Sequence, residues 1–428
     1  MGLASIRRSS GLGDQAGQGG SIGWSEIGHG ELAPADAVGV YVHFPFCSVH
    51  CPYCDFAVDA RADIPHDRYA EAVIAEIAAR APAFRRAAHG EAPGPRLVSI
   101  YFGGGTPGLW RVDALARVIA AARAAFGAGE GIDELTVEAN PGEVTAERAR
   151  GWREAGVNRV SLGLQSLDDR HLAALGRNHD AAAGPAAVSA LRAAGITNVS
   201  LDLMFALPEQ TLQGWAATLD GALELEPDHV SAYALTIERA TPFGARARRG
   251  ELVVPDGEAA AAMQEHARER LAGAGLQQYE VSSYARAGRR AVHNSLYWSG
   301  APYLGVGASA SSFRPLAAGG GWRFSNPRAT ETYLRAGAGG GGGPRPAQVE
   351  RRTAADLENE AVWLALRTAD GLDRLRHAAC FGADPVAGRE RAIESCVAAA
   401  WLEVTPTTLR PTPAGLLFAD EIATRLWR

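Results

Sequence analysis

The sequence contains no lysine, so all 42 of its basic residues are arginines. Cysteine and methionine are also scarce, with five and three residues among 428. No apolar run approaches the roughly 18 residues that a membrane-spanning helix needs. The Gly-rich stretch after Arg8 lacks the apolar segment of a secretory signal, and the Met1-Gly2 start lacks the Ser or Thr that N-myristoylation requires. We therefore expect a cytoplasmic protein without a transmembrane segment.

The remaining composition is that of a globular protein, with 47% hydrophobic and 21% charged residues. The formal net charge of -6 is small for this length and gives no indication of a nucleic-acid partner. The exclusive use of arginine accompanies abundant Ala and Gly, so we attribute it to a compositional bias of the source. A chain of this length exceeds the usual size of one hydrophobic core, which predicts a principal domain and at least one smaller domain.

From Val38 onward, short runs of β-branched or aromatic residues alternate with Ala-rich stretches of helical character. Six of these runs are predicted strands, and they cover 38–44, 98–102, 135–139, 159–164, 199–205 and 229–235. Repeated strand, helix, strand order implies a parallel sheet with right-handed crossovers, and many units in series favour closure into a barrel. The sequence therefore predicts an α/β fold with a partial, TIM-like (β/α)6 barrel. A doubly wound sheet is the alternative.

The chain is divided by changes in composition. A Gly- and Ser-rich mobile tail is expected over 1–37. The barrel domain follows over 38–275, and its last helix is expected over 257–275. An extension then covers 276–338 and begins with a possible strand at 277–284. Repeated Gly followed by Pro344 and Pro346 predicts a flexible linker over 339–352. Helical apolar spacing over 357–366 and a closing helix within 411–427 predict a smaller, mainly helical, winged-helix-like domain over 353–428.

Three cysteines, Cys47, Cys51 and Cys54, lie within eight residues directly after the first predicted strand. In a barrel, the loops after the strands form the active-site end, so these thiols face the barrel mouth. A C-x3-C-x2-C group can hold three corners of one 4Fe-4S cluster and leave the fourth iron open. The alternatives are a zinc site completed by His43 or His50, or three thiols that only share a loop. Zinc motifs usually contain a second C-x2-C unit, which is missing here.

Further candidate residues follow the later strands. The glycines before Thr106 and Pro107 would let backbone groups approach a ligand, although a tight turn would use them too. Glu138 ends the third strand and puts a carboxylate at the barrel mouth, unless it is an ordinary strand-end charge. Asp202 lies inside an apolar strand, where a carboxylate needs a partner such as an Arg or a pair of ligand hydroxyls.

The spacing of the three cysteines resembles that of the radical S-adenosylmethionine (SAM) superfamily. This resemblance implies a 4Fe-4S cluster whose open iron is chelated by the amino and carboxylate groups of SAM, and which cleaves SAM with one electron to methionine and a deoxyadenosyl radical. The later segments resemble those of oxygen-independent coproporphyrinogen oxidases and their relatives. That resemblance assigns contacts with SAM to Tyr41, Tyr53, Gly104, Gly105, Thr106, Glu138, Gln165, Arg177, Asp202 and Ala234.

Two features separate this chain from the oxidases. Phe56 stands where the oxidase pattern has a fourth cysteine, and residues 293–298 resemble the haem motif of the HemW-type haem chaperones. The resemblance implies that His293 is an axial haem ligand, with Asn294, Tyr297 and Trp298 in the same site. Imidazole is a common axial ligand, and aromatic rings offer flat apolar surface for a porphyrin. Outside this motif, such a histidine is more often a structural residue with satisfied hydrogen bonds.

The implied function is that of a haem chaperone, which carries the cluster and SAM, binds haem and hands it to an acceptor protein. This function requires two further partners, an acceptor protein, for which a membrane protein is one option, and an electron donor for the cluster. The first alternative is an oxygen-independent coproporphyrinogen III oxidase, and a more remote one is a class C radical SAM methyltransferase. Cys380 and Cys396 have no other cysteine at ligand spacing, so we expect them to be apolar side chains of C-terminal helices.

Overall fold

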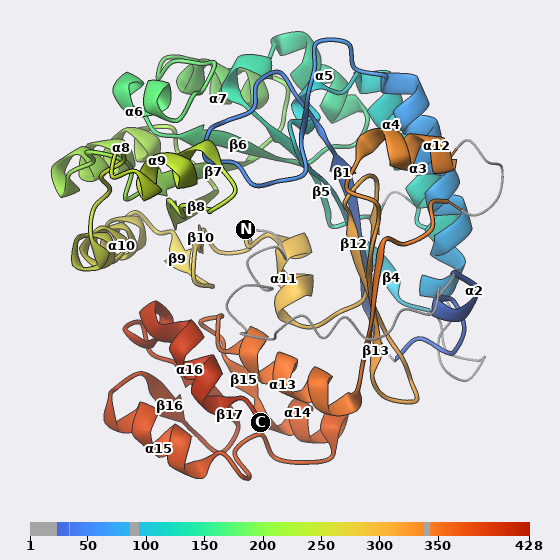
Figure 1. Cartoon of the computed structure of the whole chain (residues 1–428), viewed down its shortest axis with the longest axis vertical. Coiled ribbons are helices and arrows are strands. Elements are labelled where there is room, and N and C mark those ends of the chain that lie inside the picture. The colour runs from blue at the N-terminus through green and yellow to red at the C-terminus, as the bar shows by residue number, and fades with distance from the viewer. Residues whose placement is uncertain (1–23, 34, 86–93, 130, 338–342) are drawn as a thin grey trace.

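The computed structural model describes residues 24–33, 35–85, 94–129, 131–337 and 343–428 (Figure 1). One twelve-stranded sheet dominates it, with the strand order β14-β13-β12-β11-β1-β4-β5-β6-β7-β8-β10-β9. The six strands expected from the sequence are neighbours in this sheet, and they are β1 (Ala37–Phe44), β4 (Arg96–Gly104), β5 (Glu134–Ala139), β6 (Arg159–Gln165), β7 (Asn198–Phe205) and β8 (His229–Ala234). Their pairings are all parallel, as predicted.

The helices that connect these strands lie around the outside of the curved sheet (Figure 1). The longer ones are α3 (His66–Arg80), α4 (Val112–Phe126), α5 (Ala146–Glu154), α7 (Ala183–Ala193), α8 (Leu212–Glu224) and α10 (Gly257–Gly273), and the shorter ones are α6 (Asp169–Ala174) and α9 (Pro242–Arg248). The six parallel strands follow one another in chain order without the reversal that defines a doubly wound sheet. The fold is therefore a partial α/β barrel.

Alternation along each strand separates an apolar outer face from a polar inner one. On β5, Leu135 and Val137 belong to the core between the sheet and the helices. Glu134, Thr136 and Glu138 occupy the alternate positions and point to the inside of the barrel. The barrel interior is consequently lined by side chains that can hydrogen-bond or carry charge.

Additional strands extend the sheet on both sides of the six. Beside β1 lie β11 (Tyr303–Val306), β12 (Ser311–Pro315), β13 (Gly321–Ser325) and β14 (Gln348–Arg352), and beside β8 lie β10 (Ser283–Ala285) and β9 (Gln277–Gln278). The segment predicted as one strand over 277–284 is thus two short antiparallel strands. Helix α11 (Val292–Trp298) packs against β1 and β4 (Figure 1). The small elements are the paired strands β2 (Phe46–Cys47) and β3 (Asp59–Ala60), and α12 (Thr330–Gly337) on α3.

The predicted mobile tail is wrong for its last part. Helix α2 (Trp24–Ile27) and the residues after it pack against β12 and β13, and both Ile27 and Leu32 are fully buried. Arg314 holds this segment because its guanidinium donates hydrogen bonds to the carbonyl oxygens of His29 and Gly30, at 3.1 and 2.5 Å. The rest of that predicted tail, 1–23 and 34, lies outside the described residues.

The predicted linker is also wrong in part, because residues 348–352 form β14 and pair with β13. Residues 339–342 of this linker lie outside the described part of the chain. After Thr353 come α13 (Ala354–Ala365), β15 (Leu372–Asp373), α14 (Arg374–Phe381), α15 (Glu390–Ala398), β16 (Leu402–Val404), β17 (Thr408–Pro411) and α16 (Ala419–Leu426). They enclose a hydrophobic core of their own. That separate core supports our interpretation of 353–428 as a smaller domain.

The C-terminal elements contact the barrel near α11. Helix α13 packs on α11, Glu280 and Thr368 form a bridge between backbones, and Arg290 pairs with Asp370. Cys380 lies on α14 and Cys396 on α15, so both belong to C-terminal helices as expected, although only Cys396 is buried and Cys380 is exposed. Among the described residues, we find no helix with the length and apolar character needed to cross a bilayer.

Candidate functional site

The three neighbouring cysteines lie in the loop that begins after β1, at the mouth of the barrel. Cys47 is buried, whereas Cys51 and Cys54 are half-buried. The Thr106 hydroxyl donates to Cys47 Sγ at 3.5 Å, and Arg177 Nη1 lies 3.9 Å from Cys51 Sγ. Two polar groups from the segments after β4 and after α6 therefore already point at the thiols.

Burial disfavours the thiolate form of the cysteines in this loop. Burial raises the pKa of Cys47 to about 11, and the charges of Cys54 and Cys51 raise it further. Burial likewise raises the pKa of Cys54. A metal ion would reverse this effect because it stabilises thiolates. In the part of the chain that is described, no three His, Cys, Asp or Glu side chains are arranged to hold a metal ion, so the loop would adjust around a cluster. The donor set itself fits an iron–sulfur centre.

The glycine motif after β4 fits tightly against the cysteine loop. The N–H groups of Gly105 and Thr106 donate to the carbonyls of Phe44 and Phe46, at 2.8 and 2.9 Å. Gly104 has a φ of +113°, and a Cβ there would lie 2.6 Å from the His43 ring. Positions 104 and 105 need glycine because the glycine motif and the cysteine loop approach each other closely there. A ligand amino group, which donates hydrogen bonds, would have to bind carbonyl oxygens of this motif.

Two carboxylates lie inside the barrel below this motif. Glu138 accepts hydrogen bonds from the Tyr101 hydroxyl at 2.7 Å and from the Gly104 N–H at 3.2 Å. Asp202 accepts from the Ser161 hydroxyl at 3.1 Å. Burial raises the pKa of both carboxyl groups, and the charge of Asp202 raises the pKa of Glu138 further. A cationic ligand between them would favour their ionised forms.

Asn140 connects several of these groups, and the sequence analysis gave it no role. Its Oδ1 accepts a hydrogen bond from Arg177 Nη2, and its Nδ2 donates to Thr106 Oγ1 and to Glu143 Oε1, both at 3.4 Å. Arg177 and Thr106 are the residues that point at Cys51 and Cys47. The alternation of side chains along a strand could have identified Asn140 from the sequence, because it follows Glu138 by two positions and so lies on the same side of the chain.

The remaining predicted SAM contacts lie around the same mouth. Gln165 ends β6 with a φ of +63°, an unusual conformation that often occurs at functional sites, and its Oε1 accepts from the Tyr233 hydroxyl at 2.8 Å. Ala234 ends β8, the neighbouring strand of β7. Tyr53 lies in the cysteine loop beside Phe243, with ring centroids 6.2 Å apart. Tyr41 lies deeper, where its hydroxyl and His43 Nδ1 are 3.0 Å apart.

His293, the predicted haem ligand, lies at the opposite end of the barrel. It is 0% exposed, and its Nδ1 and Nε2 are each 2.8 Å from a hydroxyl, those of Ser99 and Tyr297. Its backbone N–H donates to Glu134 at 3.2 Å. Burial lowers the pKa of His293 to about 3. In this structure it is a structural histidine with both ring nitrogens engaged, so iron ligation would require α11 to rearrange.

The other residues of the haem motif do not meet in one open site. Tyr297 contacts His293, with ring centroids 5.0 Å apart. Trp298 packs against Trp363 of α13 and belongs to the contact with the C-terminal elements. Asn294 is half-buried on α11. The motif therefore spans two environments, one inside the barrel base and one facing α13.

Comparison with known proteins agrees with these features. Residues 41–221 match the model of the Radical SAM superfamily. The heme chaperone HemW of Haemophilus influenzae is 38% identical over 299 residues, which are 70% of this chain and 76% of that protein. The heme chaperone HemW of Mycobacterium tuberculosis strain H37Rv is 35% identical over 397 residues, 92% of this chain and 95% of that protein.

A solved structure extends the likeness to the whole fold. Coproporphyrinogen III oxidase (HemN) from Escherichia coli, a radical SAM enzyme, superposes with a TM-score of 0.79 at 20% identity and covers 100% of this chain and 98% of its own. At this identity the likeness concerns the fold alone. The sequence identity to the chaperones over most of both chains is what decides the family. The chain belongs to the family of the heme chaperone HemW, within the radical SAM superfamily.

Proposed function

We propose that this protein is a haem chaperone, which binds haem and transfers it to an acceptor protein. The observation that carries this proposal is the match over 92% of the chain to a relative named heme chaperone HemW. The cysteine loop adds support, because the position of the oxidase's fourth cysteine is occupied by Phe56, which is 52% exposed. The acceptor and the electron donor are partners that this proposal requires and leaves unidentified.

The cluster would be held by Cys47, Cys51 and Cys54. When bound, a 4Fe-4S cluster supplies one electron to SAM on its open iron. Thr106 and Arg177 would stabilise the thiolates by donating hydrogen bonds to sulfur, which is how proteins adjust the reduction potential of such clusters. A buried guanidinium next to sulfur also offsets the negative charge that three thiolates bring into a half-buried loop.

The proposed SAM site lies between the cluster loop and the ends of β4 to β8. Arg177, as a cation, suits the carboxylate of SAM, and Glu138 and Asp202 are acceptors for its hydroxyl or ammonium groups. Gln165, Tyr41, Tyr53 and Ala234 would line the rest of that site, together with Gly104, Gly105 and Thr106. Their position at the mouth or just inside it, on the side where barrel proteins bind ligands, supports this assignment.

Haem titration of the reconstituted holoprotein tests the proposed function. We expect a Soret band that saturates with haem, and its absence would refute the chaperone proposal. For the alternative oxidase, coproporphyrinogen incubated anaerobically with reduced protein and SAM should stay unconverted. Formation of vinyl products would favour the oxidase instead. A transfer assay with candidate acceptor proteins then measures whether bound haem leaves the chaperone.

A further inference from the structure

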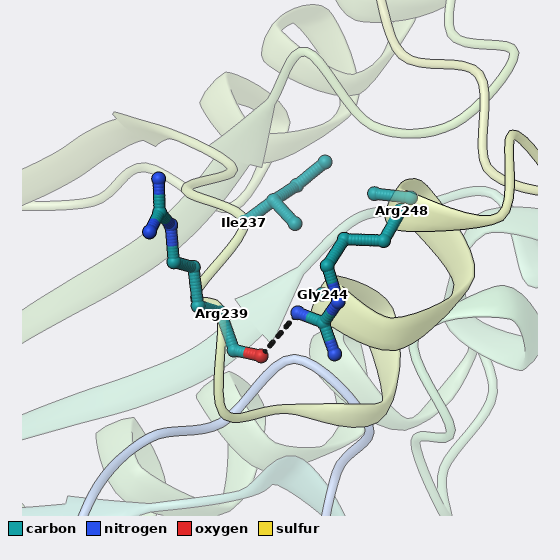
Figure 2. Close-up of a pocket in the computed structure, with 5 residues that line it drawn as sticks. Ile237, Arg239, Gly244 and Arg248 are labelled. Atoms are coloured by element: carbon teal, nitrogen blue, oxygen red, sulfur yellow. Dashed lines mark hydrogen bonds between the residues drawn. The ribbon is translucent and has the colours of Figure 1, made fainter.

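A cavity of about 560 Å³ lies at the barrel mouth, between α9 and the segment that follows β8 (Figure 2). It is lined by Ile237, Arg239, Gly244, Ala247 and Arg248. Gly244 is needed for its shape, because a Cβ there would lie 2.2 Å from the carbonyl oxygen of Glu238. Helix α9 thus packs closely on the preceding segment, and the two together form the cavity wall.

The cavity combines an apolar wall with two arginines. Ile237 belongs to a hydrophobic cluster with Phe243 and Leu207, and in Figure 2 it lies between the side chains of Arg239 and Arg248. Arg248 Nη1 donates to the carbonyl oxygen of Arg239 at 2.7 Å, which fixes its direction and leaves other N–H groups of the guanidinium for a ligand.

The charge of this segment favours an anion. Residues 237–251 contain four arginines and two glutamates, so their formal charge is +4 − 2 = +2. Arg249 is paired with Glu251 at 2.5 Å, and Arg246 lies over the Phe243 ring, 5.6 Å from its centroid. Within the described residues, neither Arg239 nor Arg248 has a carboxylate partner. The two arginines that line the cavity are therefore the ones available to a ligand.

The cavity is also connected to the cysteine loop. The Phe243 N–H at the start of α9 donates to the carbonyl oxygen of Pro52 at 3.0 Å. Pro52 directly follows Cys51, and Tyr53 packs against the Phe243 ring. Helix α9, which forms one wall of the cavity, is therefore in direct contact with the cluster loop.

We propose that this cavity binds the carboxylate-bearing edge of haem, with Arg239 and Arg248 pairing with the two propionates and Ile237 against the porphyrin face. The proposal rests on the proposed haem-chaperone function and assigns a position to its ligand. Haem is a flat apolar molecule with two carboxylates on one edge, and arginine pairs with carboxylates in a planar, two-point geometry. A few polar groups around an apolar wall are the usual composition of a ligand site. Because His293 lies at the opposite end of the barrel, haem at this position would take its axial ligand from another residue.

Haem affinity of arginine variants tests the proposal in the holoprotein. Arg239→Ala and Arg248→Ala should each weaken haem binding about fivefold, and the double variant about 20-fold, because both side chains are exposed and ion pairs at exposed sites are weak. Ala247→Glu, which puts a negative charge into the same cavity, should weaken it at least as much. Arg249→Ala is the matched control, because Arg249 is paired with Glu251 and does not line the cavity. Far-UV circular dichroism and melting temperature check that each variant folds.

A chemical comparison separates charge from other effects. Haem dimethyl ester lacks the propionate charges, so the wild type should bind it more weakly than haem, whereas the double arginine variant should bind the two about equally. If the wild type binds haem and the double variant binds it with the same affinity, the cavity assignment is wrong and the chaperone function stands. If the wild type binds no haem, the proposed function fails, and this assignment with it.

Discussion

The two ends of the barrel are built from similar polar and aromatic side chains, but they differ in which of these side chains are paired. At the N-terminal end of the strands, two buried histidines each lie between a serine and a tyrosine hydroxyl, with contacts of 2.8 Å: His293 with Ser99 and Tyr297, and His229 with Ser200 and Tyr279. This end is closed by α11 and by the C-terminal elements behind it.

Some buried polar atoms at both ends lack a hydrogen-bond partner among the described residues. They are Arg159 Nε and Nη1 at the base, and Glu143 Oε2 and Arg177 Nε at the mouth. Unpaired buried polar groups are costly, so a protein retains them mainly where a ligand, an ion or a water completes them. The difference teaches that residue type alone does not mark a binding site. Histidine at the base is structural in this conformation, whereas arginine and carboxylate at the mouth are available.

We expect the largest effect when one of the three cysteine thiols at the mouth is removed. Replacing Cys51 with Ala should abolish the broad iron–sulfur absorbance of reconstituted protein, because a cubane held at two corners by protein is not retained. Cys380→Ala is the matched control, since this exposed thiol lies far along the chain on α14 and should leave the spectrum unchanged. An intact spectrum in Cys51→Ala would refute the ligand assignment.

At the base of the barrel, we expect a substitution to lower the free energy of unfolding. His293→Ala would leave the hydroxyls of Ser99 and Tyr297 without their partner and create a cavity, so we expect a loss of about 2–4 kcal/mol in the free energy of unfolding. Chemical denaturation measures this loss. If variant protein that is still folded at low temperature also binds haem with an unchanged Soret band, His293 is purely structural. A lost Soret band with little loss of stability would instead support the axial-ligand prediction.

Asn140 should have an intermediate effect at the mouth. Asn140→Ala removes the acceptor for Arg177 and the donor to Thr106, so we expect a loss of about 1–3 kcal/mol in unfolding free energy and weaker SAM binding. Asn140→Asp keeps the acceptor for Arg177 but cannot donate to Thr106. Electron paramagnetic resonance of the reduced cluster, with and without SAM, reports the change, and unaltered spectra in both variants would contradict the connecting role. Asn158→Ala, away from the mouth, is the control.

The buried histidines at the base should also make the stability of the protein depend on pH. In the folded protein the pKa of His293 is about 3, whereas an ordinary histidine titrates near 6.5. Between these two pH values the unfolded chain therefore binds more protons than the folded protein. As a result, the free energy of unfolding falls as the pH drops from about 6.5 toward 3. The decrease is up to about 1.4 kcal/mol per pH unit for each such histidine. Burial shifts the pKa of His229 in the same direction. His293→Gln should flatten this dependence, and an unchanged slope would contradict the assignment.

The sequence by itself determined the repeated strand and helix pattern, because alternation and β-branched runs are local properties. Each of the six predicted parallel strands agrees with the structure to within a few residues, as for 199–205 and Asn198–Phe205. The cysteine spacing likewise identified the loop that carries Cys47, Cys51 and Cys54. Local composition misled us where distant residues decide the outcome. Residues 24–33 look like a Gly-rich tail, but the buried Arg314, far along the chain, binds their carbonyl groups.

Only the tertiary structure decided which side chains are free and which are paired. His293 and Ser99 are 194 positions apart, so no local pattern could reveal that the histidine is sealed in the barrel base. The same holds for Asn140 and Arg177, 37 positions apart. The cavity beside α9 also depends on packing between segments. Spacing determines which groups can reach one another, whereas burial and partners, which folding sets, determine what those groups can bind.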